Sequence, residues 1–198
     1  MRIIKILREE LEDVNRRILS SRSVTSPNLN VLRRFVLNQL YIVPHDLKSL
    51  SMFMVKAGDE LEYRFVKMLV DGDYEAYRAL VKLADELNVR FSYPELNPQA
   101  IAYTHFISWL ALNGNLGDLA IAAAVNLPIW GSNCLKLAEY ARNIGIRNTR
   151  FMEMFAGPYD ELEALAETIA LRYENMERYR FIAKTIQHYE LLFWESIA

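Results

Sequence analysis

The chain has 198 residues, of which 52% are hydrophobic and 24% charged, and its formal net charge is −2. A chain of this length buries one core large enough to fold without disulfides, so we expect a single domain over residues 1–198. The scattered basic residues exclude the electrostatic footprint of a nucleic-acid-binding protein, no apolar run is long enough to cross a membrane, and the lone Cys134 is typical of a cytoplasmic protein.

Apolar residues recur every three or four positions in the first half of the chain, which predicts amphipathic helices. These helices are expected over residues 3–20, 29–54, 59–70 and 73–87. A turn is expected at Ser23–Asn28, and a kink or break near Pro44, because a proline removes a backbone donor and clashes one turn back. Gly58, Gly72 and Asn88 each follow a periodic stretch and are expected to end helices.

The second half continues the helical pattern and contains no strand-like alternation. Helices are expected over residues 98–112, 116–143, 149–155, 160–173 and 175–194. Asn97 is expected to cap the first of these, Pro128 to kink the second, and Gly145 to end it. Short loops favour antiparallel neighbours, so the sequence predicts an all-α helical bundle.

The last predicted helix places a carboxylate among apolar side chains. Glu190 has the helical spacing of Ile182 and Ile186, so the three share one face. Loss of solvation raises the pKa of a carboxyl toward neutrality, where the group can move protons. Glu190 is therefore a candidate acid or base; the alternative is a structural ion pair with Lys184, Arg178 or a neighbouring chain.

Two other regions could supply polar groups to a pocket. Tyr103 and His105 point in different directions on a helix, and a histidine without a partner nearby in sequence is more often structural than functional. The proline-containing segments Asn38–Asp46 and Asn126–Cys134 could line a cavity with their polar side chains, or could simply bend around the core.

The spacing of histidines and carboxylates along the chain indicates whether a metal site can form. Helical di-iron proteins use Glu-x-x-His pairs, and this chain contains none. His45, His105 and His188 lack ligand partners at helical spacing, and Cys134 has no histidine within a turn to lower its thiol pKa. We therefore expect no metal and no other cofactor, and we interpret Cys134 as a small buried hydrophobic residue.

Several short motifs occur in a specific order: AYTHF, an NGN turn, LPIW, GPY and a terminal YELLFW. In this order they resemble the TenA (thiaminase II) family of the haem-oxygenase-like superfamily, over about Asn97 to Trp194, with a weaker similarity in FVLNQLYIV. The most specific element is Glu190, four residues before Trp194. The resemblance implies a haem-oxygenase-like helical bundle with a central pocket, a homo-oligomer (dimer or tetramer), and hydrolysis or salvage of a thiamin-derived aminopyrimidine.

The resemblance also implies site residues. Glu190 matches the family's proton-moving glutamate. The candidate contacts to a small-molecule ligand are Tyr41, Tyr103, Asn126, Trp130, Phe155 and Tyr189. The family's nucleophilic cysteine has no counterpart beside Pro128, and Leu40 replaces its pyrimidine-binding aspartate, so covalent catalysis is not expected.

Three functions are compatible with these features. The first is a TenA-like protein that hydrolyses or binds an aminopyrimidine or related heterocycle through Glu190. The second is a non-catalytic protein that binds a small molecule in the same pocket. The third is an oxidase of the PqqC or di-iron type, which shares the fold and would contain iron.

Overall fold

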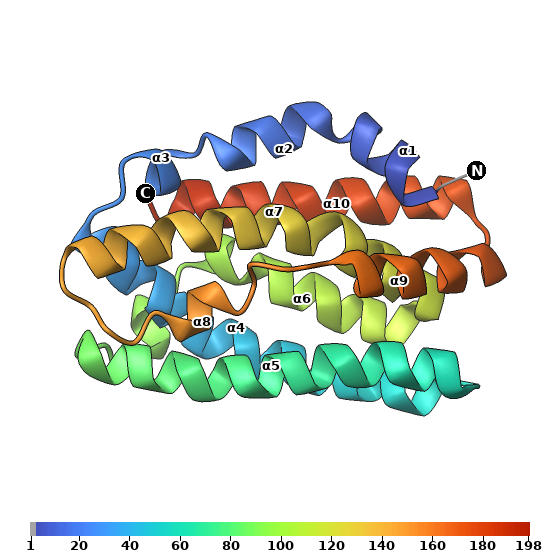
Figure 1. Cartoon of the computed structure of the whole chain (residues 1–198), viewed down its shortest axis with the longest axis horizontal. Coiled ribbons are helices and arrows are strands. Elements are labelled where there is room, and N and C mark those ends of the chain that lie inside the picture. The colour runs from blue at the N-terminus through green and yellow to red at the C-terminus, as the bar shows by residue number, and fades with distance from the viewer. Residues whose placement is uncertain (1–2) are drawn as a thin grey trace.

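The computed structural model describes residues 3–198, and its regular elements are all helices (Figure 1), which confirms the predicted all-α class. The helices are α1 (Ile3–Glu10), α2 (Glu12–Leu19), α3 (Arg22–Thr25), α4 (Leu29–Lys56), α5 (Glu60–Glu86), α6 (Pro98–Asn113), α7 (Leu116–Asn143), α8 (Arg150–Glu153), α9 (Asp160–Arg172) and α10 (Met176–Ser196), with a 3-10 turn at Tyr93–Glu95.

The long helices lie roughly parallel to one axis in stacked layers (Figure 1). Helices α4 and α5 pack against each other on one side, α6, α7 and α10 form the middle, and α1–α3 lie along α10 on the opposite side. The core between the layers contains large buried aromatic side chains, including Phe35, Phe53, Phe65, Tyr179 and Trp194. Burial of each such side chain contributes roughly 1.5–3 kcal/mol.

The helix bounds in the first half differ from the sequence expectation in three places. The first predicted helix is divided into α1 and α2 at Leu11, and the expected turn at 23–28 contains the short helix α3. Helix α5 runs unbroken through Gly72, where an added Cβ would meet nothing within 4 Å. A glycine inside a helix costs about 1 kcal/mol, and the packing of α5 along α4 outweighs that cost.

Both prolines lie inside continuous helices, Pro44 in α4 and Pro128 in α7. Pro128 has no backbone N–H to give the carbonyl of Ala124, one turn earlier. That carbonyl instead accepts a hydrogen bond of 2.6 Å from Nη2 of Arg8, on α1. A side chain from the first helix therefore satisfies the backbone group that the proline leaves free.

The predicted cap at Asn97 and the predicted stop at Gly145 are confirmed, and the structure adds a cap at Asn115 that the sequence analysis did not predict. The Asn97 side chain accepts a bond from the backbone N–H of Gln99 at 2.9 Å, and Asn115 forms a reciprocal capping box with Asp118 at the start of α7. Gly145, just after α7, has a φ of +89°, a left-handed conformation that glycine adopts without steric cost.

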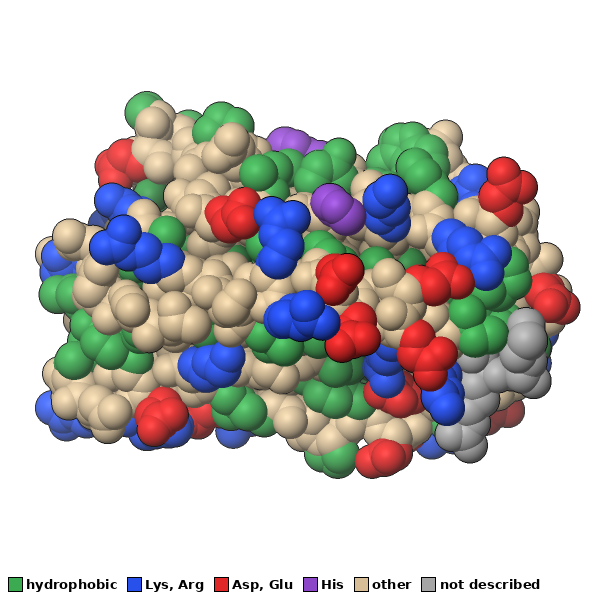
Figure 2. All heavy atoms as spheres, turned by 90° about the horizontal axis from the view of Figure 1, so that it is seen from above, with side chains coloured by type: hydrophobic (Ala, Val, Ile, Leu, Met, Phe, Trp, Pro, Cys, Tyr) green, Lys and Arg blue, Asp and Glu red, His purple; other side chains and the backbone are tan. Residues whose placement is uncertain are grey.

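The surface carries a mixture of charges. On the face drawn in Figure 2, basic and acidic side chains are interspersed among the described residues rather than gathered by sign. Across residues 3–198, no helix combines the length and the apolar character that a membrane crossing requires.

Candidate active site

A small cavity of about 60 Å³ lies inside the bundle, between α4, α5, α6, α7 and α10. Its polar lining residues are Gln39, Asp46, Asp73, Tyr103, Asn126 and Glu190. Its apolar lining residues are Ile42, Val43, Leu127, Trp130, Phe155 and Phe193. The cavity is smaller than the roughly 300–1,000 Å³ of most ligand pockets, so a ligand of ordinary size would have to displace part of this lining.

Glu190 is the most buried carboxyl of the cavity, with 1% of its surface exposed. The indole N–H of Trp194 donates to its Oε1 at 3.1 Å, and the Asn126 amide N–H donates to its Oε2. Burial raises the pKa of Glu190 to about 8, and the two hydrogen bonds oppose this shift by stabilising the carboxylate. A group with this pKa exchanges its proton readily near neutral pH.

Asn126 connects Glu190 to the rest of the polar lining. The hydroxyl of Tyr103 donates to Oδ1 of Asn126 at 3.2 Å, and the Asn126 amide also donates to Gln187 at 3.0 Å. Gln187 in turn donates to Asn15 on α2 at 2.5 Å. Burial raises the pKa of Tyr103 well above its ordinary value, and the nearby carboxyls add to that shift, so its hydroxyl stays neutral and available as a donor.

Two further carboxyl groups line the cavity: the sequence analysis placed Asp46 only within a segment that could line a pocket, and it did not assign Asp73 to the site. Asp46 on α4 and Asp73 on α5 are both half-buried. Burial raises the pKa of Asp73 to about 7, and it raises the pKa of Asp46 well above its ordinary value, with the Asp73 charge as the second cause. The hydroxyl of Thr104 donates to Asp46 at 2.5 Å.

Aromatic rings form the wall next to Glu190. The Trp130 ring stacks on Phe35 with centroids 5.7 Å apart and meets the Phe155 ring edge-on at 6.0 Å. A Cβ added at Gly131 would collide with the carbonyl of Phe155 and the hydroxyl of Tyr159. The segment 155–159 therefore lies directly on α7, which fixes Phe155 over the cavity.

Four of the six predicted ligand contacts line the cavity together with Glu190: Tyr103, Asn126, Trp130 and Phe155. Tyr41 and Tyr189 do not. The Tyr41 hydroxyl bonds to Nε2 of His105 at 3.1 Å and its ring stacks on His45 near the surface, while the Tyr189 ring packs against Phe106. On α4 the cavity-facing positions are 39, 42, 43 and 46, and position 41 is rotated about 200° from position 39.

The lone thiol is not activated. Cys134 is buried, and burial raises its pKa well above the ordinary value, with the Glu190 charge as a second cause. A protonated thiol is a poor nucleophile. Within residues 3–198 no group of three or more His, Cys, Asp or Glu side chains is arranged to hold a metal ion.

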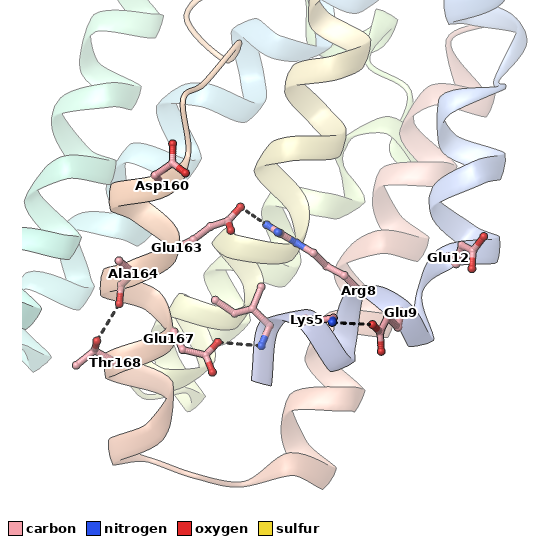
Figure 3. Close-up of a pocket in the computed structure, with 10 residues that line it drawn as sticks. Lys5, Arg8, Glu9, Glu12, Asp160, Glu163, Ala164, Glu167 and Thr168 are labelled. Carbon is pink, nitrogen blue, oxygen red and sulfur yellow. Dashed lines mark hydrogen bonds and ion pairs between the residues drawn. The ribbon is translucent and has the colours of Figure 1, made fainter. Parts of the chain in front are cut away.

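A larger hollow of about 820 Å³ lies on the surface between α1 and α9 (Figure 3). Bonds cross the groove at two places: Arg8 pairs with Glu163 at 2.6 Å, and the backbone N–H of Ile4 donates to Glu167 at 3.0 Å. These bonds attach the first helix to α9 and leave few polar groups in the hollow free to bind a ligand. The smaller central cavity, with its buried acid and its perturbed pKa values, is therefore the candidate site.

Comparison with known proteins agrees with this architecture. A model of the TENA/THI-4/PQQC family matches residues 22–198. A TenA homologue from Pyrococcus furiosus has a TM-score of 0.79 and 19% identity, covering 99% of this chain and 100% of that chain. A TenA homologue from P. horikoshii has a TM-score of 0.77 and 20% identity, covering 100% of this chain and 98% of that chain. A TenA homologue from Pseudomonas syringae pv. tomato has a TM-score of 0.79 and 12% identity, covering 98% of this chain and 91% of that chain.

These structural matches establish the fold, and the expected haem-oxygenase-like bundle is confirmed. No curated protein matches the chain.

Proposed function

This chain belongs to the TENA/THI-4/PQQC family, and we propose that it serves thiamin-pyrimidine salvage as a TenA-like protein, which binds and hydrolyses an aminopyrimidine or a related small heterocycle through Glu190. The observation that carries the proposal is the Glu190 carboxyl, buried at the cavity with a pKa of about 8 and oriented by Trp194 and Asn126.

The proposed reaction is the direct attack of water on the carbon that bears the leaving amine. The ionised Glu190 accepts a proton from the water as its oxygen bonds to that carbon, and then delivers the proton to the amine nitrogen as the C–N bond breaks. The products are the hydroxylated ring and the free amine. Because the Cys134 thiol is buried and protonated, this route uses no covalent intermediate.

Tyr103 and Asn126 would orient the ligand beside Glu190. The two side chains are already hydrogen-bonded to each other at 3.2 Å, so little conformational freedom is lost when a ligand binds to them. A substituted pyrimidine exceeds the cavity of about 60 Å³. We therefore propose that binding moves the half-buried wall residues Trp130 and Phe155 outward.

The test is the isosteric change Glu190→Gln, assayed by product formation from 4-aminopyrimidines that carry a substituent at the 5-position. We expect turnover to fall at least about 100-fold, since the proton carrier is removed, while the protein stays folded. The matched control is Glu195→Gln on the same helix, where the side chain is 52% exposed and turnover should be unchanged. Full turnover by Glu190→Gln would contradict the proposal.

The aromatic wall supports a second candidate, a protein that binds a small molecule without converting it. Trp130, Phe155 and Phe193 give one side of the cavity an apolar surface suited to a flat ring. This alternative predicts saturable binding that Glu190→Gln leaves unchanged, and no product at any pH.

We also propose that residues 1–198 act as one unit that assembles into a homodimer or homotetramer in the cytoplasm. Exposed apolar side chains support assembly: Leu112 is 68% exposed, and Trp109 and Phe181 lie beside each other at the surface with ring centroids 6.2 Å apart. Native mass spectrometry would test this, and a monomer at micromolar concentration would contradict it.

A further inference from the structure

The central cavity contains acidic groups without any basic counterpart. Its lining includes three carboxyls, Asp46, Asp73 and Glu190, and no lysine, arginine or histidine. Within residues 3–198 neither Asp46 nor Asp73 forms an ion pair, and the only side-chain hydrogen bond to the pair is the one from Thr104 to Asp46. Glu190, in contrast, receives two donors from the protein.

The same protein supplies counter-charges to carboxyls buried elsewhere. Asp118 is fully buried, and Arg178 binds it through Nε at 2.9 Å. Glu62 is also buried and has Arg172 at 3.7 Å and the Tyr173 hydroxyl at 2.9 Å. Internal carboxylates that lack such a partner are costly. The unmatched pair at the cavity therefore indicates that the counter-charge comes from outside the chain.

Gln39 gives independent evidence that a polar ligand enters this space. Its side chain is 97% buried (3% exposed) and lines the cavity, yet it forms no hydrogen bond with any described residue. Among the described residues the only fully enclosed side-chain atom without a partner is Oδ1 of Asn133, so the Gln39 amide opens onto the cavity, where a ligand can reach it. Gln39 and Asp46 lie on the same face of α4, about two turns or 10 Å apart, so α4 offers polar groups at both ends of the cavity.

A second hollow of about 70 Å³ adjoins the first. The two share Asp46, Asp73, Tyr103 and Leu127, and the remaining lining of the second is apolar, including Leu69 and Ile107. The carboxyl pair thus lies at the junction between a polar space and a hydrocarbon-lined one. This arrangement suits a ligand in which a positive charge is attached directly to an apolar body.

We propose that Asp46 and Asp73 form a cation subsite, which binds a primary ammonium or amidinium group of the ligand while Glu190 acts at the other end of the cavity. The inference rests on the proposed function in one respect, since both use the same cavity. It adds a class of ligand: a small organic cation, recognised by residues on α4 and α5 that the family resemblance does not assign.

The subsite has a defined pH dependence. The titratable groups that face the cavity are Asp46 on α4, Asp73 on α5, Tyr103 on α6 and Glu190 on α10. Burial raises the pKa of Asp73 to about 7 and that of Asp46 well above its ordinary value. A cation binds the ionised carboxylates, so its affinity should rise between pH 6 and 8 while the ligand's own amine stays protonated.

The test compares benzylamine with benzyl alcohol, which have the same size and ring but differ in charge, by calorimetric titration of the full chain at pH 8. We expect benzylamine to bind at least about tenfold more tightly. Asp73→Asn should remove most of that preference and leave benzyl alcohol binding unchanged. The matched control is Asp71→Asn on the same helix, whose carboxylate is 60% exposed and paired with Lys67, and whose loss should not alter the preference.

Each other outcome overturns the subsite. Equal binding of the two probes, binding of neither, or a preference that survives Asp73→Asn would each refute it. Asp73 receives no hydrogen bond from a described side chain, so Asp73→Asn should fold even if Asp46→Asn does not. Because these probes contain no pyrimidine, the protein can prefer benzylamine even if it does not turn over aminopyrimidines. Turnover of aminopyrimidines without a preference for benzylamine would support the proposed function and refute the cation subsite.

Discussion

The two ends of the cavity solve the problem of burying a carboxyl in different ways. At one end Glu190 is enclosed and receives hydrogen bonds from Trp194 and Asn126. At the other end Asp46 and Asp73 are half-buried, and Thr104 supplies the one side-chain hydrogen bond that the described residues give them. The first arrangement fixes the position of a carboxyl, as the proposed proton transfer requires, whereas the second leaves two carboxyls open to the proposed cation.

The largest expected effect is at the enclosed end. Glu190→Ala should lower the free energy of unfolding by about 3 kcal/mol, because it opens a cavity and leaves the Trp194 N–H without its acceptor. Chemical denaturation at pH 6 would measure this. Asp73→Ala, at the open end, should cost less than about 1 kcal/mol, and equal losses would show that the two ends do not differ.

The pH dependence of stability sharpens the comparison. The native state keeps a proton on Glu190 up to about pH 8, whereas the unfolded chain releases it near the ordinary value of 4.5. Between these values the native state holds one more proton at Glu190, so this group alone makes stability fall as pH rises, by at most about 1.4 kcal/mol per pH unit. Thermal or denaturant unfolding from pH 5 to 8 would measure the slope.

Two variants show how much of the pH dependence of stability comes from Glu190 and how much from Asp73. Glu190→Gln should reduce it over the whole range, and Asp46 and Asp73 should supply the part that remains. Asp73→Asn should flatten it only below about pH 7, where the raised pKa of Asp73 ends its contribution. If Glu190→Gln keeps the wild-type slope, the Glu190 pKa is not raised.

A smaller effect is expected from Thr104→Val, which preserves side-chain shape but removes the hydrogen bond to Asp46. Because the hydroxyl stabilises the carboxylate, its loss should raise the Asp46 pKa further and cost about 1 kcal/mol at pH 8. The cost should become smaller as the pH is lowered, because burial raises the pKa of Asp46 and the protonated form then becomes more populated. A loss that does not depend on pH would indicate a packing effect instead.

The smallest effect is expected from Tyr41→Phe. This change removes a hydroxyl that bonds to His105 outside the cavity, so the free energy of unfolding should change by less than about 0.5 kcal/mol. Ligand binding and turnover should match the wild type in the same assays. Loss of ligand binding by Tyr41→Phe would show that Tyr41 contributes to the site.

Local patterns in the sequence predicted the enclosed end better than the open end. Glu190 lies on the buried face that its spacing from Ile182 and Ile186 indicated, although its catalytic role stays a prediction. Asp73 was taken as the start of a helix after Gly72, and Asp46 as the end of a proline-containing segment, Asn38–Asp46, in which the helix was expected to kink or break. Both helices continue through those positions.

The reason for the difference is physical. Glycine and proline lower local helix propensity, but the packing of long neighbouring helices overrides that preference. Once α4 and α5 are continuous, residues far apart in sequence, such as Asp46 and Asp73, line the same space. No signal within a single helix could have indicated that pairing, since it depends on how two helices are placed side by side.

The hydrogen bond from Arg8 to the carbonyl of Ala124 has a consequence for the protein's boundaries. The family match begins at residue 22, yet Arg8 binds the turn of α7 that precedes Asn126, and Asn15 supports Gln187 behind the same amide. A shortened chain starting at Arg22 would retain every cavity-lining side chain and lose the Arg8 and Asn15 contacts that support the segment around Asn126. We therefore expect the chain without α1 and α2 to hold Asn126 and Gln187 less firmly than the full chain does, although the family match covers both residues.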